Sequence, residues 1–572
     1  MTTSDPDADA ARDAAEEAAK AAEAAEKAAQ EARKRAEELA AAAQEAEADP
    51  PVEPSEPAGQ PGSSQASEIV ELVKAGYAFD GAALQIGALV DGEPVPEAQV
   101  RIPLAMLNRH GLVAGATGTG KTKTLQVLAE QLATLGVPVF AADIKGDLSG
   151  IATAGIPNDK LLARATSIGQ DWQPAATPTE FFTLGGLGTG VPIRASINAF
   201  GPLLLSKVLG LNATQESSLA LVFHYAREAK LPLVDLGDLR SVLTYLTGAG
   251  KAELKELGGL SSATAGVILR ELIAFSDAGA DVFFGQPEIK TSDFLRTTSD
   301  GKGVVSLLEV PSVYDKPALF STFLMYLLSQ LFKELPEVGD TEKPKLVFFF
   351  DEAHLLFKDA SKDFLESVAQ TVRLIRSKGV GVFFVTQTPK DVPTDVLAQL
   401  GSRVQHQLRA HTPDAAKALR ATVSTYPNSS YDLEEVLTQL AIGEAIVTVM
   451  NEKGAPSPVA WTRVRAPQGS MEPTPADQIA TAVNASPLLA QYGTAVNPES
   501  ATESIEAKEA AAQEAAAKKP TWDEEIKETT RRRTRTESTS RYRRQSPLEK
   551  AAGEAARTAA RELIKRIFSR RR

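Results

Sequence analysis

Residues 110–126 read HGLVAGATGTGKTKTLQ, and this stretch decides the fold. An apolar run leads into glycines with the spacing G-x-x-x-x-G-K-[ST], which is typical of the phosphate-binding loop (P-loop) of nucleotide hydrolases. In such a loop, backbone N–H groups and the start of the following helix bind phosphate oxygens. The pattern predicts a nucleotide-binding segment made of Gly115, Ala116, Thr117, Gly118, Thr119, Gly120, Lys121, Thr122 and Lys123.

Two side chains of this segment carry the expected chemistry. Lys121 would neutralise the β- and γ-phosphates of ATP, and the Thr122 hydroxyl would be a ligand of Mg²⁺. The alternative is a glycine loop that binds no ligand. The strand pattern before the loop, the helix pattern after it and a second motif downstream favour nucleotide binding.

The second motif is KLVFFFDEAH, residues 345–354, an apolar strand that ends in two adjacent carboxylates. Asp351 at the strand tip is expected to hold the Mg²⁺ shell, and Glu352 to polarise a water towards the γ-phosphate. The alternative is that Glu352 only begins a helix, as acidic residues often do. The adjacent pair favours ATP hydrolysis.

Three more positions are candidates for the catalytic site. Gln387 ends the apolar stretch VGVFFVTQ and is expected either to sense the γ-phosphate or to cap the strand. Arg376 or Arg403 could be the cation that a neighbouring subunit lends to the site. Arg373 and Arg376 share a helix face, so a solvated surface is the alternative for both.

An acidic residue follows the next strand pattern along the chain. Asp143 lies in ADIKGDLSG, residues 141–149, where the apolar run ends. It could order Lys121, the waters of the metal or the nucleotide. The alternative is that it begins a turn ahead of Gly146.

The order of apolar runs predicts an α/β fold with a mainly parallel sheet. The strand at 137–144 completes a β–loop–α–β unit with the P-loop. Residues 200–280 have helical periodicity and predict a helical insertion, whereas 181–197 looks like a hairpin insertion. Further strands are expected at 303–310, 345–350, 380–387, 403–408 and 444–450.

Composition divides the chain into five parts. They are an acidic Ala/Glu-rich tail and linker (1–66), a small β-rich entry element (67–108), an ATPase domain (109–467), a helix and linker (468–528), and a basic tail (529–572). The first part has 16 acidic and 6 basic residues, and the last has 15 basic and 4 acidic residues. Both tails are expected to be helical or disordered low-complexity segments.

Composition also excludes several kinds of protein. Without cysteine there is no disulfide framework or thiolate metal site, which fits a cytoplasmic protein. The five histidines form no zinc-binding motif. The apolar stretch 317–332 contains Ser and Gln and is short for a membrane span, so we expect a buried core helix.

The basic tail has three readings. Its arginines could bind nucleic-acid phosphates without reading sequence. Its last residues, AARELIKRIFSRRR, could instead contact an anionic membrane surface or a partner groove. The third reading is a flexible solubilising tail that contacts the acidic N-terminal segment.

Four stretches in order, 108–126, 137–150, 343–357 and 372–387, resemble the HerA-like ATPases of the HerA–FtsK group. The best fit is to the bacterial YjgR-type subfamily, and the resemblance covers about 67–467. It implies a RecA-like core that assembles as a ring, a homo-hexamer with ATP between subunits. It also implies DNA as a partner and a nuclease or other processing protein as another. Family members begin with a larger β-barrel than residues 67–108 can form.

The resemblance assigns roles by motif. It makes Glu352 the catalytic carboxylate and Gln387 the sensor. Arg376 takes the position of the family's interface arginine. Arg109 precedes the P-loop strand, where the family has a basic residue near the nucleotide, and Asp143 matches a family acid.

Three functions remain open at this point. The first is an ATP-driven ring motor that acts on DNA, as a translocase or helicase-like ATPase. The second is an ATPase that moves a polypeptide or a membrane-associated cargo. The third is a scaffold that binds nucleotide without hydrolysing it.

Overall fold

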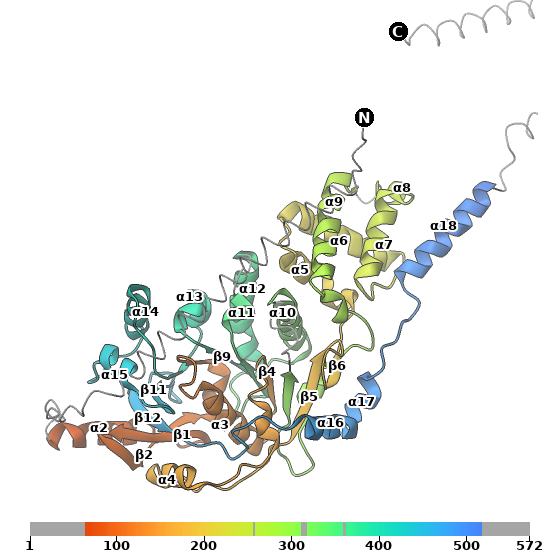
Figure 1. Cartoon of the computed structure of the whole chain (residues 1–572). Coiled ribbons are helices and arrows are strands. Elements are labelled where there is room, and N and C mark those ends of the chain that lie inside the picture. The colour runs from red at the N-terminus through yellow and green to blue at the C-terminus, as the bar shows by residue number, and fades with distance from the viewer. Residues whose placement is uncertain (1–62, 256–257, 310–316, 358–361, 518–572) are drawn as a thin grey trace, which may run out of the picture. The chain divides into compact units, whose positions relative to one another are not determined.

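The computed structural model describes residues 63–255, 258–309, 317–357 and 362–517 of the 572-residue chain (Figure 1). The acidic tail up to residue 62, the basic tail at 529–572 and the contacts expected of these tails lie outside the described residues. By its internal contacts the chain divides after Glu68.

A sheet of 12 strands runs through the described residues, in the order β2-β1-β12-β11-β10-β3-β9-β8-β4-β7-β5-β6. Every neighbouring pair from β10 to β6 is parallel, and every pair from β2 to β10 is antiparallel. This confirms the predicted mainly parallel α/β sheet. The strands are β1 Ala83–Asp91, β2 Glu93–Pro103, β3 Gly111–Ala114, β4 Val139–Asp143, β5 Thr179–Leu184, β6 Val191–Ile193, β7 Val305–Glu309, β8 Leu346–Phe350, β9 Val380–Thr386, β10 Ser402–Gln405, β11 Glu444–Thr448 and β12 Ala460–Val464.

The expected hairpin at 181–197 was wrong. β5 and β6 lie next to each other but run parallel, with Phe182 opposite Val191. Between them the chain passes through Gly185, Gly186 and Gly188, all with positive φ. These glycines let the chain coil back before it re-enters the sheet, whereas a hairpin needs a direct reversal.

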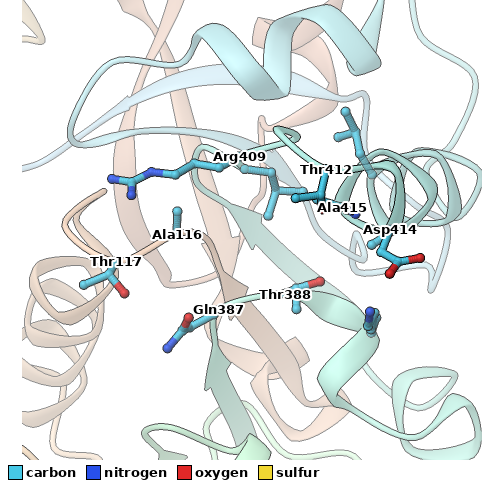
Figure 2. A pocket seen from close by; sticks show the side chains of 12 residues that line it. Ala116, Thr117, Gln387, Thr388, Arg409, Thr412, Asp414 and Ala415 are labelled. Carbon is cyan, nitrogen blue, oxygen red and sulfur yellow. Dashed lines mark hydrogen bonds between the residues drawn. The ribbon is translucent and has the colours of Figure 1, made fainter. Parts of the chain in front are cut away.

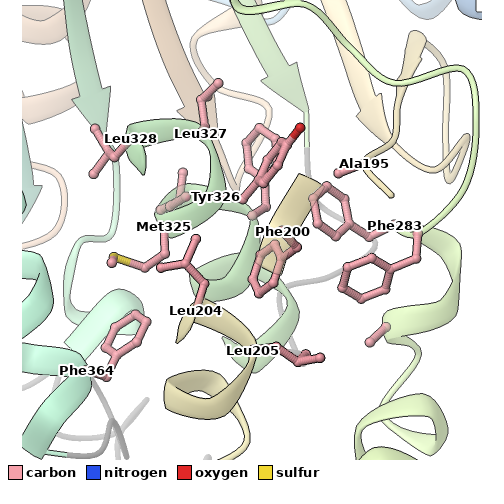
Figure 3. Packing of buried hydrophobic residues seen from close by; sticks show 14 of the residues in the cluster. Ala195, Phe200, Leu204, Leu205, Phe283, Met325, Tyr326, Leu327, Leu328 and Phe364 are labelled. Carbon is pink, nitrogen blue, oxygen red and sulfur yellow. The ribbon is translucent and has the colours of Figure 1, made fainter. Parts of the chain in front are cut away.

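Both faces of the parallel strands are buried, which explains their continuous apolar runs. Successive residues of β8 alternate between two cores: Phe348 and Phe350 belong to one, Val347 and Phe349 to the other. The first core continues into the helices, where Phe200 stacks on the Tyr326 ring at 5.8 Å (Figure 3).

The helices on the first core include the predicted insertion. Asn212 and Asp235 cap two of its helices with reciprocal hydrogen bonds. The predicted buried helix at 317–332 is α10, whose residues Phe323–Leu328 are buried. Among the described residues, no helix combines the length and apolar character needed to cross a membrane. These helices are α5 Ile197–Val208, α6 Ala213–Glu228, α7 Leu236–Thr247, α8 Lys251–Lys255, α9 Ser262–Asp277, α10 Pro317–Glu334 and α12 Lys362–Ile375.

The segment after β12 packs back on the ATPase core. Gln468 and Gly469 donate backbone hydrogen bonds to the Glu130 carboxylate on α3, both at 2.8 Å. Further on, Lys508 of α18 pairs with Glu253 of the insertion at 2.9 Å. The remaining helices are α2 Ser63–Gly76, α3 Lys121–Thr134, α4 Asp159–Ser167, α11 His354–Phe357, α13 Thr394–Leu397, α14 Pro413–Val423, α15 Leu433–Gln439, α16 Ala476–Ala485, α17 Pro487–Tyr492 and α18 Ala501–Ala517.

Candidate functional site

The carboxyl ends of neighbouring parallel strands bring the sequence motifs together. β10, β3, β9, β8 and β4 lie side by side in that order. Ala114, the last residue of β3, lies opposite Thr386 of β9, and Phe350 of β8 lies opposite Phe384. The P-loop therefore begins beside Gln387, and Asp351 follows one strand further along. We call this region the carboxyl end of the sheet.

The P-loop has the shape that its glycines predict. Gly120 is the N-cap of α3 and has a φ of 113°. A Cβ on Gly115 would lie 2.5 Å from the Cβ of His406, so only glycine fits there. The Thr119 hydroxyl donates to the Ala116 carbonyl over 2.7 Å and closes the loop. The free N–H groups at the start of α3 are therefore presented at the carboxyl end of the sheet.

His406 packs against Gly115 of the P-loop and bonds to α3, a role that the sequence did not predict. Its Nδ1 donates to the Glu444 carbonyl at 2.8 Å, so its Nε2 accepts from the Thr124 hydroxyl at 2.9 Å. Burial lowers the pKa of His406 to about 4, and the charges of Lys121 and Arg164 also lower it. The ring is neutral. In the sequence, His406 looks like any other buried residue of the strand stretch RVQHQL.

Lys121 lies among charged neighbours. Its side-chain Nζ donates to the Ala116 carbonyl over 3.1 Å. Burial lowers the pKa of Lys121, the carboxylates of Glu352 and Asp351 raise it, and Lys145 lowers it. The four charged groups are thus within electrostatic range of one another. From the sequence we expected Lys121, Asp351 and Glu352 to lie together, but not Lys145.

Asp351 and Glu352 form a tight turn after β8. The Glu352 N–H donates to Asp351 Oδ1 over 2.9 Å, and Glu352 has a left-handed φ of 47°. A non-glycine residue pays roughly 1–3 kcal/mol for such a conformation, which tends to occur at functional sites. Burial raises the pKa of Asp351 to about 7, with further contributions from the Glu352 and Asp143 carboxylates.

The two oxygens of Glu352 have different surroundings. Oε1 accepts a hydrogen bond from the Lys145 ammonium. His354 Nδ1 lies 3.2 Å from Oε2, within ion-pair distance, but not at hydrogen-bonding angles. Among the described residues, Oε2 is therefore a buried acceptor without a hydrogen bond. A buried oxygen of this kind is costly, and it is suited to accept a hydrogen bond from a water.

Asp143 organises the loop that follows β4. Its Oδ1 accepts from the backbone N–H of Lys145 at 3.2 Å and of Gly146 at 2.8 Å, and its Oδ2 accepts from Leu148 at 2.8 Å. This is the geometry of a turn-starting aspartate. The loop carries Lys145, which sequence reasoning also missed. The available signal was a lysine just after a strand that ends beside the site.

Gln387 lines a pocket of about 420 Å³ next to the P-loop (Figure 2). Ala116 and Thr117 line the same pocket, together with residues from the start of α14. Arg409, which follows β10, extends its guanidinium towards the P-loop side of this pocket. Arg409 was not predicted as a site residue, because nothing in the stretch QHQLR distinguishes it from a surface arginine.

Arg109 and Arg376 lie at the opposite end, which we call the amino end of the sheet. Arg109 ends the 3₁₀ turn Leu104–Arg109 ahead of β3, and Arg376 begins the turn ahead of β9. β9 has seven residues and spans roughly 20 Å, more than an arginine side chain can reach. Arg376 can therefore not contact a nucleotide in the P-loop of its own chain. Arg109 precedes the four-residue β3 and lies on the side of that strand away from the P-loop.

Arg403 is held within its own chain. It lies in β10, and its guanidinium donates to the Thr425 carbonyl over 3.1 Å. The same group lies over the Tyr426 ring, 5.9 Å from the ring centre. Both contacts would have to break before Arg403 could reach another subunit.

The side chains at the carboxyl end fit a nucleotide-bound Mg²⁺. Among the described residues, no group of three or more His, Asp or Glu side chains could hold a metal by itself. Mg²⁺ in nucleotide sites needs only one or two protein oxygens, since phosphates and waters complete its shell. The Thr122 hydroxyl and the Asp351 carboxylate are hard oxygen ligands of that type.

Comparison with known families agrees with this site. The sequence model of the helicase HerA-like C-terminal family matches residues 89–570. The chain belongs to this family. It is a P-loop ATPase of the helicase and translocase class.

Curated relatives of this HerA-like chain are distant. It is 26% identical over 384 residues to the DNA double-strand break repair helicase HerA of Saccharolobus solfataricus, covering 66% of this chain and 68% of that protein. It is 22% identical over 374 residues to the HerA of Sulfolobus acidocaldarius, covering 64% and 67%.

Solved structures resemble the HerA-like chain loosely. The plasmid coupling protein TrwB, in complex with ADP and Mg²⁺, is 17% identical with a TM-score of 0.48. That match covers 71% of this chain and 94% of TrwB. Because the TM-score is below 0.5, the fold assignment rests on the strand order of the chain itself.

Proposed function

We propose that this chain is the ATP-hydrolysing subunit of a ring motor that acts on DNA. The observation that carries the proposal is the convergence of Lys121, Asp351 and Glu352 at the carboxyl end of the sheet. The relatives named as DNA repair helicases support DNA as the cargo. The position of Arg376 at the amino end supports a site completed by a second copy.

In this mechanism each side chain has one task. The P-loop N–H groups and Lys121 bind the β- and γ-phosphates of ATP. Thr122 and Asp351 would hold Mg²⁺, which neutralises charge on those phosphates. Glu352 accepts a proton from the attacking water through Oε2, which has no hydrogen bond among the described residues.

The other predicted residues contribute around this centre. Gln387, which directly follows β9, senses the γ-phosphate from the pocket beside the P-loop. Lys123 belongs to the first turn of α3, and its Nζ is held by the Met471 carbonyl. Asp143 acts indirectly, because its carboxylate orders the loop that carries Lys145. Arg109 and Arg376 act on the nucleotide of a neighbouring copy.

The assembly that we propose is a homo-hexameric ring in the cytoplasm. A nuclease or another DNA-processing protein as partner, and the place in the YjgR-type subfamily, stay predictions from the sequence resemblance. Contact of the basic tail with nucleic acid or a membrane also stays a prediction.

ATP turnover of the full chain tests this function, measured with and without duplex or single-stranded DNA at low salt, together with the mass in solution. We expect DNA to stimulate turnover and the active species to be an oligomer. In Glu352→Gln, turnover should fall by roughly 100-fold or more while ATP still binds. If DNA has no effect, a polypeptide or membrane-associated cargo is favoured. If Glu352→Gln equals wild type, the hydrolytic role of Glu352 is wrong.

A further inference from the structure

Lys145 is a charged group at the carboxyl end of the sheet that has no task in the proposed mechanism. It follows β4, and β4 pairs with β8 so that Ala142 lies opposite Phe350. Lys145 and Glu352 therefore leave adjacent strand ends, although they are 207 residues apart in sequence.

The backbone holds Lys145 in place. Its own N–H and that of Gly146 are bonded to the Asp143 carboxylate, and Gly146 has a φ of 77°. The Ser149 hydroxyl donates to the Gly146 carbonyl over 2.8 Å. A turn closed by this many hydrogen bonds positions its side chain before a ligand arrives, which lowers the cost of binding.

Lys145 supplies the counter-charge of Glu352. The Glu352 side chain is only 3% exposed, whereas that of Lys145 is 40% exposed. A buried carboxylate needs a paired cation, because an unpaired buried charge is strongly destabilising. Burial lowers the pKa of Lys145, but the contact with Glu352 and the charge of Asp351 outweigh this effect and raise it. The ammonium is charged.

Lys145 also acts on Lys121. Its positive charge contributes to the lowered pKa of Lys121, so the two ammonium groups repel each other. An anion placed between two such cations relieves this repulsion. In the proposed mechanism Lys121 contacts the β- and γ-phosphates, and the γ-phosphate is the group nearest Glu352.

We propose, on the basis of the ATPase function argued above, that Lys145 is a second lysine that binds the γ-phosphate. ATP draws its ammonium away from Glu352, and the freed carboxylate then orients the attacking water. ADP has no γ-phosphate and leaves the Lys145–Glu352 pair intact. Lys145 thereby makes the state of the catalytic carboxylate depend on which nucleotide is bound.

The experiment measures binding of ATPγS and of ADP, each with Mg²⁺, to the full chain by calorimetry. In Lys145→Met we expect ATPγS affinity to fall by about ten-fold, because one charge-assisted hydrogen bond is lost, and ADP affinity to be unchanged. Turnover of ATP should fall as well. Lys145→Arg keeps the charge and should restore most of the ATPγS affinity.

A double-mutant cycle separates the γ-phosphate role from a structural one. Glu352→Gln removes the competing carboxylate, so Lys145 is free and ATPγS should bind more tightly than to wild type. This gain should disappear in the double variant with Lys145→Met. A lysine that only stabilises the buried Glu352 would not change the ratio of ATPγS to ADP affinity.

Two results would overturn the role of Lys145. One is equal loss of ATPγS and ADP affinity in Lys145→Met, and the other is wild-type ATPγS affinity with wild-type or faster turnover. Both require a wild-type chain that hydrolyses ATP. If wild type itself binds no ATP and hydrolyses none, the proposed function fails first, so the two failures are distinguishable.

Discussion

The two ends of the parallel sheet differ in how they hold charge. At the carboxyl end, Lys121 and Glu352 are buried and tied into a network. At the amino end, the Arg376 side chain is 37% exposed and lies 3.6 Å from Asp340, which is 84% exposed. A surface pair of this kind contributes about 0–1 kcal/mol, so Arg376 can change partner at little cost. In the ring that we propose, each chain would therefore supply two halves of different ATP sites, one at each end of its parallel strands.

Removal of Lys121 should have the largest effect, because it takes the central cation from the carboxyl end. In Lys121→Ala, ATP affinity should fall by roughly 100-fold or more, with loss of turnover. The fold should persist, since the loop is held by Thr119 and His406. Calorimetry with ATP and far-UV circular dichroism measure both. Unchanged ATP affinity would mean that this end of the sheet is not the nucleotide site.

The amino end is tested by Arg376→Ala. Turnover should fall by about 1,000-fold, the low end of the range for an arginine supplied by another subunit, while ATP binding stays near wild type. Arg373→Ala is the matched control: Arg373 is exposed one helical turn earlier and should change turnover little. Equal effects of the two variants would remove the special role of Arg376.

Arg403 should have a smaller effect on catalysis. Its guanidinium is bonded to Thr425 and lies over Tyr426, so Arg403→Ala should leave turnover within about two-fold of wild type. It should lower the stability of the segment around Thr425 by about 1 kcal/mol. Steady-state kinetics and thermal melting measure the two effects. A turnover loss as large as that of Arg376→Ala would make Arg403 the interface cation instead.

The smallest effect on turnover is expected at His406, where the main change is a pH-dependent loss of stability. The folded-state pKa of His406 is lowered to about 4 from 6.5, so its contribution is complete above about pH 6.5 and is lost as the pH falls towards 4. His406→Asn should therefore cost more stability at pH 7.5, about 1–3 kcal/mol, than at pH 5. Thermal melting of both chains at the two pH values tests the sign. A larger cost at pH 5 would contradict a neutral buried ring.

Local patterns in the sequence predict the parts of the fold that depend on neighbouring residues. The glycine spacing around Lys121 and the apolar runs of the parallel strands are signals of this kind, because such strands are buried on both faces. The motif around Asp351 follows the same rule. The path between β5 and β6 was missed because three glycines permit either a hairpin or a coiled-back connection.

Contacts between distant segments could not be predicted in this way. The Lys145–Glu352 pair spans 207 residues, and the Thr124–His406 hydrogen bond spans 282. Neither residue of the second pair belongs to a motif. The position of Arg109 at the amino end of the sheet could, however, have been predicted from the sequence. A residue just before a parallel strand must lie at the opposite end from the loop that follows the strand.

Subunit mixing tests most directly whether the two ends of the sheet complete one another. Lys121→Ala keeps Arg376 but lacks a working carboxyl end, whereas Arg376→Ala has the reverse defect. In co-expressed mixed rings with equal amounts of each chain, roughly a quarter of the interfaces join an intact site to an intact arginine. We predict that ATP turnover recovers in the mixture, although each variant alone is inactive. No recovery in rings shown to contain both chains would contradict a site shared between copies.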